Sequence, residues 1–255
     1  MAKQLKIVLF FCTLLIWGCQ SGNGSKTSTA STNPNSGLHY WTGLIGKDIP
    51  VRLSYYIKDN IINGELVYTG TKKQTPIKIL GMKSDNTFML YEFETDGHIT
   101  GTWFGNDVTN TLFEGSWFSP TASTELKVHL EALDGGTFND TARDKKAVDG
   151  MYQYMLGKEG AMGNLDVSRL GSDSVIISFS NVTDAPARNQ AVMDSVHLSL
   201  KNNTAVYSDS SDLGACKFNI RFCNGYAVVD YIDGKYECGF GNNAFVKGVY
   251  LKTGK

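Results

Sequence analysis

Three carboxylates lie close together in the stretch YEFETDG, at Glu92, Glu94 and Asp96. Paired carboxylates hydrolyse glycosides when they face each other across a cleft at a suitable separation. Because strand side chains alternate with a period of two, these three are expected on one polar face of a single half-buried strand. This pattern favours a solvated strand face over a glycosidase site. We therefore predict no catalytic residue and a protein that is not an enzyme.

Side chains suited to metals or cofactors are dispersed. None of the four histidines has a cysteine or a second histidine at metal-ligand spacing. The acidic run SDSSD, Ser208 to Asp212, lacks the glycine and the dense oxygen ligands of a calcium loop. Gly239-x-Gly241 does not open a helix after a strand, as a dinucleotide fingerprint does. We predict no metal and no cofactor.

One loop contains side chains suited to recognition. The segment NVTDAPARNQAVMD places Arg188, Asn189 and Gln190 in a long loop of small residues between two expected strands. Loops on rigid β scaffolds often carry binding residues, and an arginine offers a fork of donors to a carboxylate or a glycan. We predict a partner-binding loop here, with a solvated connector as the alternative.

Three cysteines belong to the second half of the chain. In ACKFNIRFC, strand alternation places Cys216 on the same face as Phe218. It places Cys223, at the end of this segment, on the opposite face. The best disulfide is therefore Cys216–Cys238, which leaves Cys223 free beside the turn pair Asn224-Gly225.

Short runs with strand character alternate with turn pairs such as Asp96-Gly97 and Asn224-Gly225 along the whole chain. Asx-Gly pairs supply the positive φ angles of two-residue hairpins, and regular strand spacing is typical of an all-β sandwich or barrel. The strands expected are 38–46, 49–57, 61–69, 76–82, 87–94, 98–104, 111–118, 125–132, 149–156, 161–170, 174–181, 192–200, 203–208, 215–223, 226–232 and 242–252.

The only plausible domain boundary lies in a segment rich in Gly, Asp and Lys. We expect two tandem antiparallel meander domains of barrel or sandwich type, at 38–134 and 148–255, joined by a linker at 135–147. A short helix near 141–146 is compatible with that linker. The alternative is one continuous barrel or sandwich.

A small motif recurs in both halves: an apolar residue, any residue, glycine, any residue, then an aromatic. All three key positions share one strand face, so the glycine removes a side chain where the sheet is packed and lets a neighbouring aromatic cover the gap. We interpret the motif as barrel geometry with core aromatics. The copies are Ile99–Trp103, Phe113–Trp117, Val148–Tyr152 and Val246–Tyr250.

The first residues have the pattern of an export signal. Lys3 and Lys6 precede an apolar run from Ile7 to Trp17, which is too short to span a bilayer. The sequence LIWGC resembles the lipobox of bacterial lipoproteins, although Trp17 departs from its usual small or aliphatic residue. The resemblance implies cleavage of a signal peptide at 1–18 and a lipid anchor on Cys19.

The following residues have the composition of a tether. The segment 19–37 is rich in Ser, Thr, Asn and Gly and has too little apolar surface to fold. Loss of Lys3 and Lys6 with the signal leaves 22 basic against 25 acidic residues, a net charge of about −3. This balance argues against a nucleic-acid partner.

Taken together, the lipobox, the tether and the β modules resemble those of small envelope lipoproteins of Bacteroidetes-like bacteria. The stretch from Cys216 to Tyr250 is similar to β-barrel domains of lysozyme-inhibitor-type lipoproteins, but their inhibitory loop motifs are absent from this sequence. We expect a non-enzymatic, lipid-anchored cell-envelope protein that binds a protein or glycan through its loops. The alternatives are a carrier of a small apolar ligand inside a barrel, a lysozyme-inhibitor-like protein and a glycan-active enzyme. The sequence favours neither the periplasmic nor the surface face of the outer membrane.

Overall fold

The computed structural model describes residues 37–85, 87–134, 147–211, 214–234 and 237–254, all of which lie within the unit Asn33–Lys255. Every regular element in these ranges is a β-strand. Within them, no helix has the length and apolar character needed to cross a bilayer. The predicted all-β class is confirmed.

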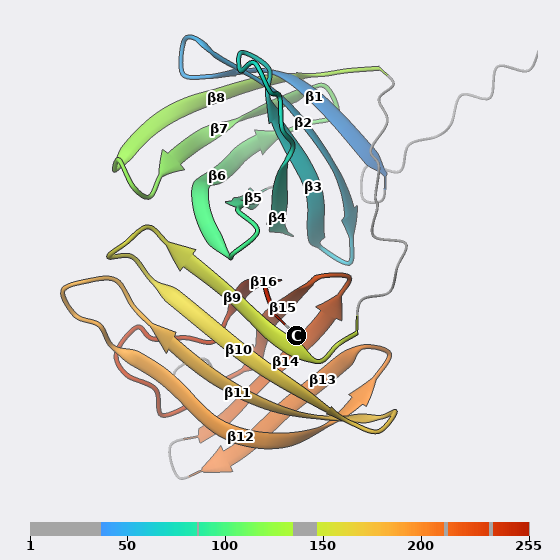
Figure 1. Cartoon of the computed structure of the whole chain (residues 1–255), viewed down its shortest axis with the longest axis vertical. Coiled ribbons are helices and arrows are strands. Elements are labelled where there is room, and N and C mark those ends of the chain that lie inside the picture. Colours follow the sequence, from blue (N-terminus) through green and yellow to red (C-terminus); the bar gives the residue numbers. More distant parts are fainter. Residues whose placement is uncertain (1–36, 86, 135–146, 212–213, 235–236, 255) are drawn as a thin grey trace, which may run out of the picture. The chain divides into compact units, whose positions relative to one another are not determined.

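The first eight strands close into a barrel. Each pairs antiparallel with the next along the chain, and β1 pairs with β8 to complete the ring. Figure 1 shows these strands curving around a common interior. They are β1 (Leu38–Ile45), β2 (Ile49–Lys58), β3 (Ile61–Tyr68), β4 (Ile77–Ser84), β5 (Thr87–Phe93), β6 (His98–Val108), β7 (Leu112–Ser119) and β8 (Thr124–Ala132).

The last eight strands form a second antiparallel ring, closed by pairing of β9 with β10 and with β16. They are β9 (Gly150–Leu156), β10 (Met162–Leu170), β11 (Ser174–Val182), β12 (Gln190–Lys201), β13 (Thr204–Ser211), β14 (Gly214–Cys223), β15 (Tyr226–Asp233) and β16 (Gly248–Lys252). Two tandem meander barrels are therefore present, as the sequence predicts.

The sequence misplaces one strand start. The expected strand 242–252 begins only at Gly248, because Asn243 has a φ of 57°, which a strand cannot contain, and Ala244 donates its N–H to the carbonyl of Gly241 in a turn. The linker at 135–147 and its possible helix fall almost entirely outside the described residues. The division into separate domains at 38–134 and 148–255 stays a prediction.

The barrels are joined by backbone and side-chain contacts. A short parallel pairing connects β6 to β9, where His98 lies opposite Met155 and Ile99 opposite Leu156. A buried apolar cluster draws residues from both barrels, including Phe93 of β5 and Val228 of β15. Each barrel also has its own interior core.

Large aromatic side chains fill the interior of the first barrel. Rings from different strands meet edge to face, for example Trp41 with Phe113 and Trp103 with Phe113, at centroid distances of 6.1 and 6.3 Å. Trp41, Trp103 and Phe113 are at most 1 % exposed. The core role predicted for the recurring aromatics is thus confirmed at Trp103.

In the second barrel, the same motif ends in a tyrosine whose hydroxyl turns back on the chain. Tyr152 donates to the carbonyl of Val148, and Tyr250 donates to the carbonyl of Val246, both at 2.6 Å. In each case the acceptor is the first residue of the motif. The motif therefore ties the residue just before a strand to a side chain within that strand, and it also places an aromatic ring in the core.

Candidate functional site

Glu92, in β5, points into the first barrel and is 1 % exposed. The prediction that it lies on a solvated face with Glu94 and Asp96 is wrong. By alternation, Glu92 shares its strand face with Phe88 and Leu90, which both belong to the interior core. Beyond Phe93 the strand ends, and Glu94 and Asp96 are exposed in the following turn.

Four neutral donors from the three strands β3, β6 and β7 converge on the Glu92 carboxylate. Oε1 accepts the indole Nε1–H of Trp103 at 2.7 Å and that of Trp117 at 2.8 Å. The hydroxyl of Tyr68 donates to both oxygens, at 2.9 and 3.1 Å, and that of Thr100 reaches Oε2 at 3.2 Å. The carboxylate thereby ties β3, β5, β6 and β7 together at one end of the barrel.

Burial and hydrogen bonding act on Glu92 in opposite directions. Desolvation raises the pKa of Glu92, because an ionised carboxylate loses its water; the donated hydrogen bonds lower the pKa by a smaller amount. Burial also raises the pKa of Tyr68, and the adjacent Glu92 charge raises it further, so the phenol stays protonated as a donor. Among the described Asp, Glu, Lys, Arg and His side chains, Glu92 alone is fully buried.

A glycine makes room for this cluster. A Cβ built on Gly101 would overlap both Nε1 of Trp117 and the carboxyl group of Glu92. Gly101 is the central glycine of the motif Ile99–Trp103, and the side chain that covers it is the aromatic of the neighbouring copy. This confirms the predicted purpose of the glycine at this position.

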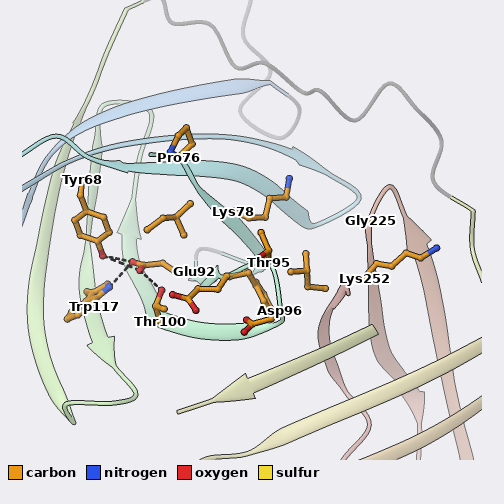
Figure 2. A pocket seen from close by; sticks show the side chains of 14 residues that line it. Tyr68, Pro76, Lys78, Glu92, Thr95, Asp96, Thr100, Trp117, Gly225 and Lys252 are labelled. Atoms are coloured by element: carbon orange, nitrogen blue, oxygen red, sulfur yellow. Dashed lines mark hydrogen bonds between the residues drawn. The ribbon is translucent and has the colours of Figure 1, made fainter. Parts of the chain in front are cut away.

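The cluster forms the side of a pocket of about 730 Å³. Figure 2 shows Tyr68, Trp117 and Thr100 around Glu92, with Asp96 and Thr95 on the adjoining turn. This volume lies in the range of small-molecule sites, which are about 300–1,000 Å³. The lining also includes Pro76, Lys78 and Glu94 of the first barrel and Gly225, Leu251 and Lys252 of the second.

Glu92 is poorly placed to act as a general acid. Both of its oxygens already accept hydrogen bonds, and almost none of the side chain meets solvent. A catalytic acid must lie within reach of the group that it protonates. The arrangement is better suited to holding a charge and an aromatic wall in place beside a ligand.

The predicted loop Arg188–Gln190 makes contacts within the chain. The guanidinium of Arg188 pairs with Glu159 at 2.6 Å, and its side chain is 34 % exposed. Asn189 donates its side-chain amide to the carbonyl of Asn242, and Gln190 opens β12. These residues fasten their loop to neighbouring loops, and none of them lines the large pocket.

The cysteines follow the strand-face prediction. Cys216 and Cys238 form a disulfide, with Cα atoms 4.7 Å apart. Cys223 is free and half-buried, and burial raises the pKa of its thiol. Cys19 lies outside the described residues.

One group of potential metal ligands occurs in the described ranges, formed by Glu94, Asp96 and His98, all exposed. Asp96 already pairs with His98 Nδ1 at 3.0 Å and accepts the backbone N–H of His98 at 3.1 Å. Exposed acidic turns of this kind are common, and we assign no metal to this one.

A second buried polar group lies inside the second barrel. Asn181 is 2 % exposed and donates its amide to the hydroxyl of Tyr250 and the carbonyl of Phe245, at 2.7 and 2.8 Å. The neighbouring pocket has a volume of only about 130 Å³. Asn181 therefore anchors the segment before β16 and leaves the Glu92 pocket as the stronger candidate site.

Sequence reasoning missed the Glu92 cluster, although two signals for it exist. Glu92 shares a face with Phe88 and Leu90, and two copies of the glycine motif end in tryptophans, whose indole N–H groups usually have acceptors when buried.

Comparisons with protein-family models, curated proteins and solved structures found no match for this chain.

Proposed function

We propose that this is a lipid-anchored envelope protein that binds a glycan in the pocket beside Glu92. The observation that carries the proposal is the combination, in one concave site, of two aromatic side chains, Tyr68 and Trp117, with convergent polar groups. Aromatic rings offer apolar surface to the C–H face of a sugar, and carboxylates and hydroxyls bond its hydroxyl groups. The lipobox at Gly18-Cys19 supports the anchor.

A glycan suits this pocket better than a protein does. Protein partners meet broad surfaces of about 800 Å² on each side, whereas a pocket of 730 Å³ has the size of a site for one to a few sugar rings. Two loops border it, the β3–β4 connection that ends at Pro76 and the β5–β6 turn with Thr95. The proposed site thus lies beside loops, but they are not the loop of Arg188, Asn189 and Gln190 that the sequence predicts.

A carrier of an apolar ligand has less support. Aromatic side chains fill the interior of the first barrel, and the pocket that Glu92 lines contains carboxylates and lysines. Enclosed apolar cavities, by contrast, suit apolar ligands.

The test is titration calorimetry of the full chain carrying Cys19→Ala against a panel of cell-wall and plant oligosaccharides. We expect at least one to bind to the unaltered pocket and its affinity to fall about tenfold or more in Glu94→Gln, the loss of one charge-assisted hydrogen bond. Glu125→Gln, an exposed carboxylate of β8 outside the pocket lining, is the matched control and should bind normally. Equal binding by all three proteins would place the glycan elsewhere, and no binding at all would refute the proposal.

A further inference from the structure

The pocket beside Glu92 is lined by more carboxylates than ammonium groups. Glu92, Glu94 and Asp96 all line it. Of the two lining lysines, Lys252 directs its ammonium to the carbonyls of Ala147 and Asp149. Figure 2 shows the Lys78 side chain extending away from Glu92.

The partners of Glu92 within the described chain are all neutral. Indole N–H groups are donors only, so Oε1, which accepts two of them, serves as an acceptor. The phenol of Tyr68 and the hydroxyl of Thr100 complete the set. Buried charges in proteins are normally paired with an opposite charge, and here none of the five ion pairs among the described residues includes Glu92.

We infer that the ligand of this pocket carries a protonated amine, which supplies a positive charge that no described residue places beside Glu92. This inference rests on the proposed function, since it names the class of glycan, an amino sugar with a free amine. Glu94 is exposed and offers a direct acceptor. When Glu92 is ionised, solvent screens its charge poorly, because the side chain is nearly enclosed.

An ammonium group fits the geometry better than a metal ion. A hard cation such as Ca²⁺ needs six to eight oxygen ligands. Both oxygens of Glu92 are already engaged by donors from fixed strands, and Asp96 is held by His98. An ammonium has three donors and needs only two or three acceptors around it.

Three ligands distinguish recognition of the amine from recognition of the sugar. They are an oligosaccharide of β-1,4-linked glucosamine, its fully N-acetylated counterpart, and the polyamine spermidine, each titrated into the full chain carrying Cys19→Ala at a pH where the amine is protonated. The same titrations are made on Glu94→Gln, Glu92→Gln and the control Glu125→Gln. Thermal unfolding of each variant establishes that it is folded.

We expect the free amino sugar to bind at least tenfold more tightly than the acetylated one, and this preference to shrink about fivefold or more in Glu94→Gln and in Glu92→Gln. Equal affinity for both sugars would overturn the amine inference and leave glycan binding intact. Binding of spermidine alone, weakened in the two pocket variants, would support the amine and refute the glycan. A preference for the amine that persists in both pocket variants would overturn the assignment to this pocket. If Glu92→Gln does not fold, the preference of Glu94→Gln for the amine tests the assignment to this pocket by itself, because Glu94 is exposed and its replacement should not disturb the fold.

Discussion

Trp117 and Glu92 are 25 residues apart in the sequence, and Nε1 of Trp117 donates to Oε1 of Glu92 at 2.8 Å. The bond crosses from β7 to β5, over the intervening strand β6. Trp103, in β6, shares the same acceptor. A single carboxylate thus holds the aromatic wall of the pocket in place, so the binding that we propose there would depend on a residue that also stabilises the fold.

Replacement of Glu92 by alanine should destabilise the protein by about 2–4 kcal/mol, because the indole N–H of Trp103 would remain buried without an acceptor. Glu92→Gln should cost only about 1 kcal/mol, since the amide oxygen can still accept from the indoles and the hydroxyls of Tyr68 and Thr100 can turn to accept from its NH₂ group. Urea unfolding followed by tryptophan fluorescence measures both. Equal cost for the two variants would contradict this assignment of donors.

The stability of the wild-type protein relative to Glu92→Gln should depend on pH. Burial raises the folded-state pKa of Glu92 above that of the unfolded chain, so protonation favours the folded state. The free energy of unfolding of the wild type, minus that of Glu92→Gln, should therefore be largest below about pH 4 and decrease as pH rises through the folded-state pKa. Asp96, whose pKa is lowered mainly by the backbone N–H of His98, acts in the opposite sense and at lower pH.

If the difference in free energy of unfolding between the wild type and Glu92→Gln does not change with pH, the hydrogen bonds lower the pKa of Glu92 as much as burial raises it. Repeated urea titrations between pH 4 and 8 provide the measurement. The variant Glu94→Gln, altered at an exposed position just beyond the end of β5, is measured in parallel as a control for a carboxylate replaced near the pocket.

Strand positions and the Cys216–Cys238 pairing were predictable because both depend on local alternation and turn chemistry. The face of Glu92 was misjudged because β5 is apolar on both sides: Phe88 and Leu90 face the barrel interior, while Phe93 packs in the cluster shared with the second barrel. A rule that assigns carboxylates to the solvent side fails in such a strand. The convergence of Tyr68, Trp103 and Trp117 depends on barrel closure, which the sequence of one strand does not contain.

Gly101→Ala should destabilise the protein by about 1–3 kcal/mol, because the added Cβ would overlap Trp117 and Glu92. The matched control is Gly248→Ala, at the same position of the Val246–Tyr250 motif. There the nearest heavy atom, in Tyr250, would lie 3.4 Å from the new Cβ, which is an ordinary contact. We expect the control to change the free energy of unfolding by less than about 1 kcal/mol. Chemical denaturation of both variants compares them, and a larger loss in the control would refute the steric account.

Removal of the disulfide by the double change Cys216→Ala and Cys238→Ala should lower the free energy of unfolding by about 3 kcal/mol, since the bridge closes a loop with a sequence separation of 22. Mass mapping of the unreduced protein should find the two residues in one cross-linked pair of peptides.

Cys223 should react with a thiol reagent slowly until the protein is denatured, because burial raises its pKa and covers part of its side chain. A bridge that contains Cys223 would contradict both the strand-face argument and the structure.

Cys19→Ala should release the protein from membranes, because the lipobox resemblance implies that Cys19 is acylated and the apolar run Ile7–Trp17 is too short to span a bilayer by itself. Fractionation of cells that express the wild type, Cys19→Ala and the control Cys223→Ala measures this. The wild type and the control should sediment with membranes. Wild-type protein treated with a lipase that cleaves acyl esters should lose the mass of its ester-linked acyl chains. Retention of Cys19→Ala in the membrane fraction after a high-salt wash would refute the anchor, since a surface ion pair to lipid would not survive that wash.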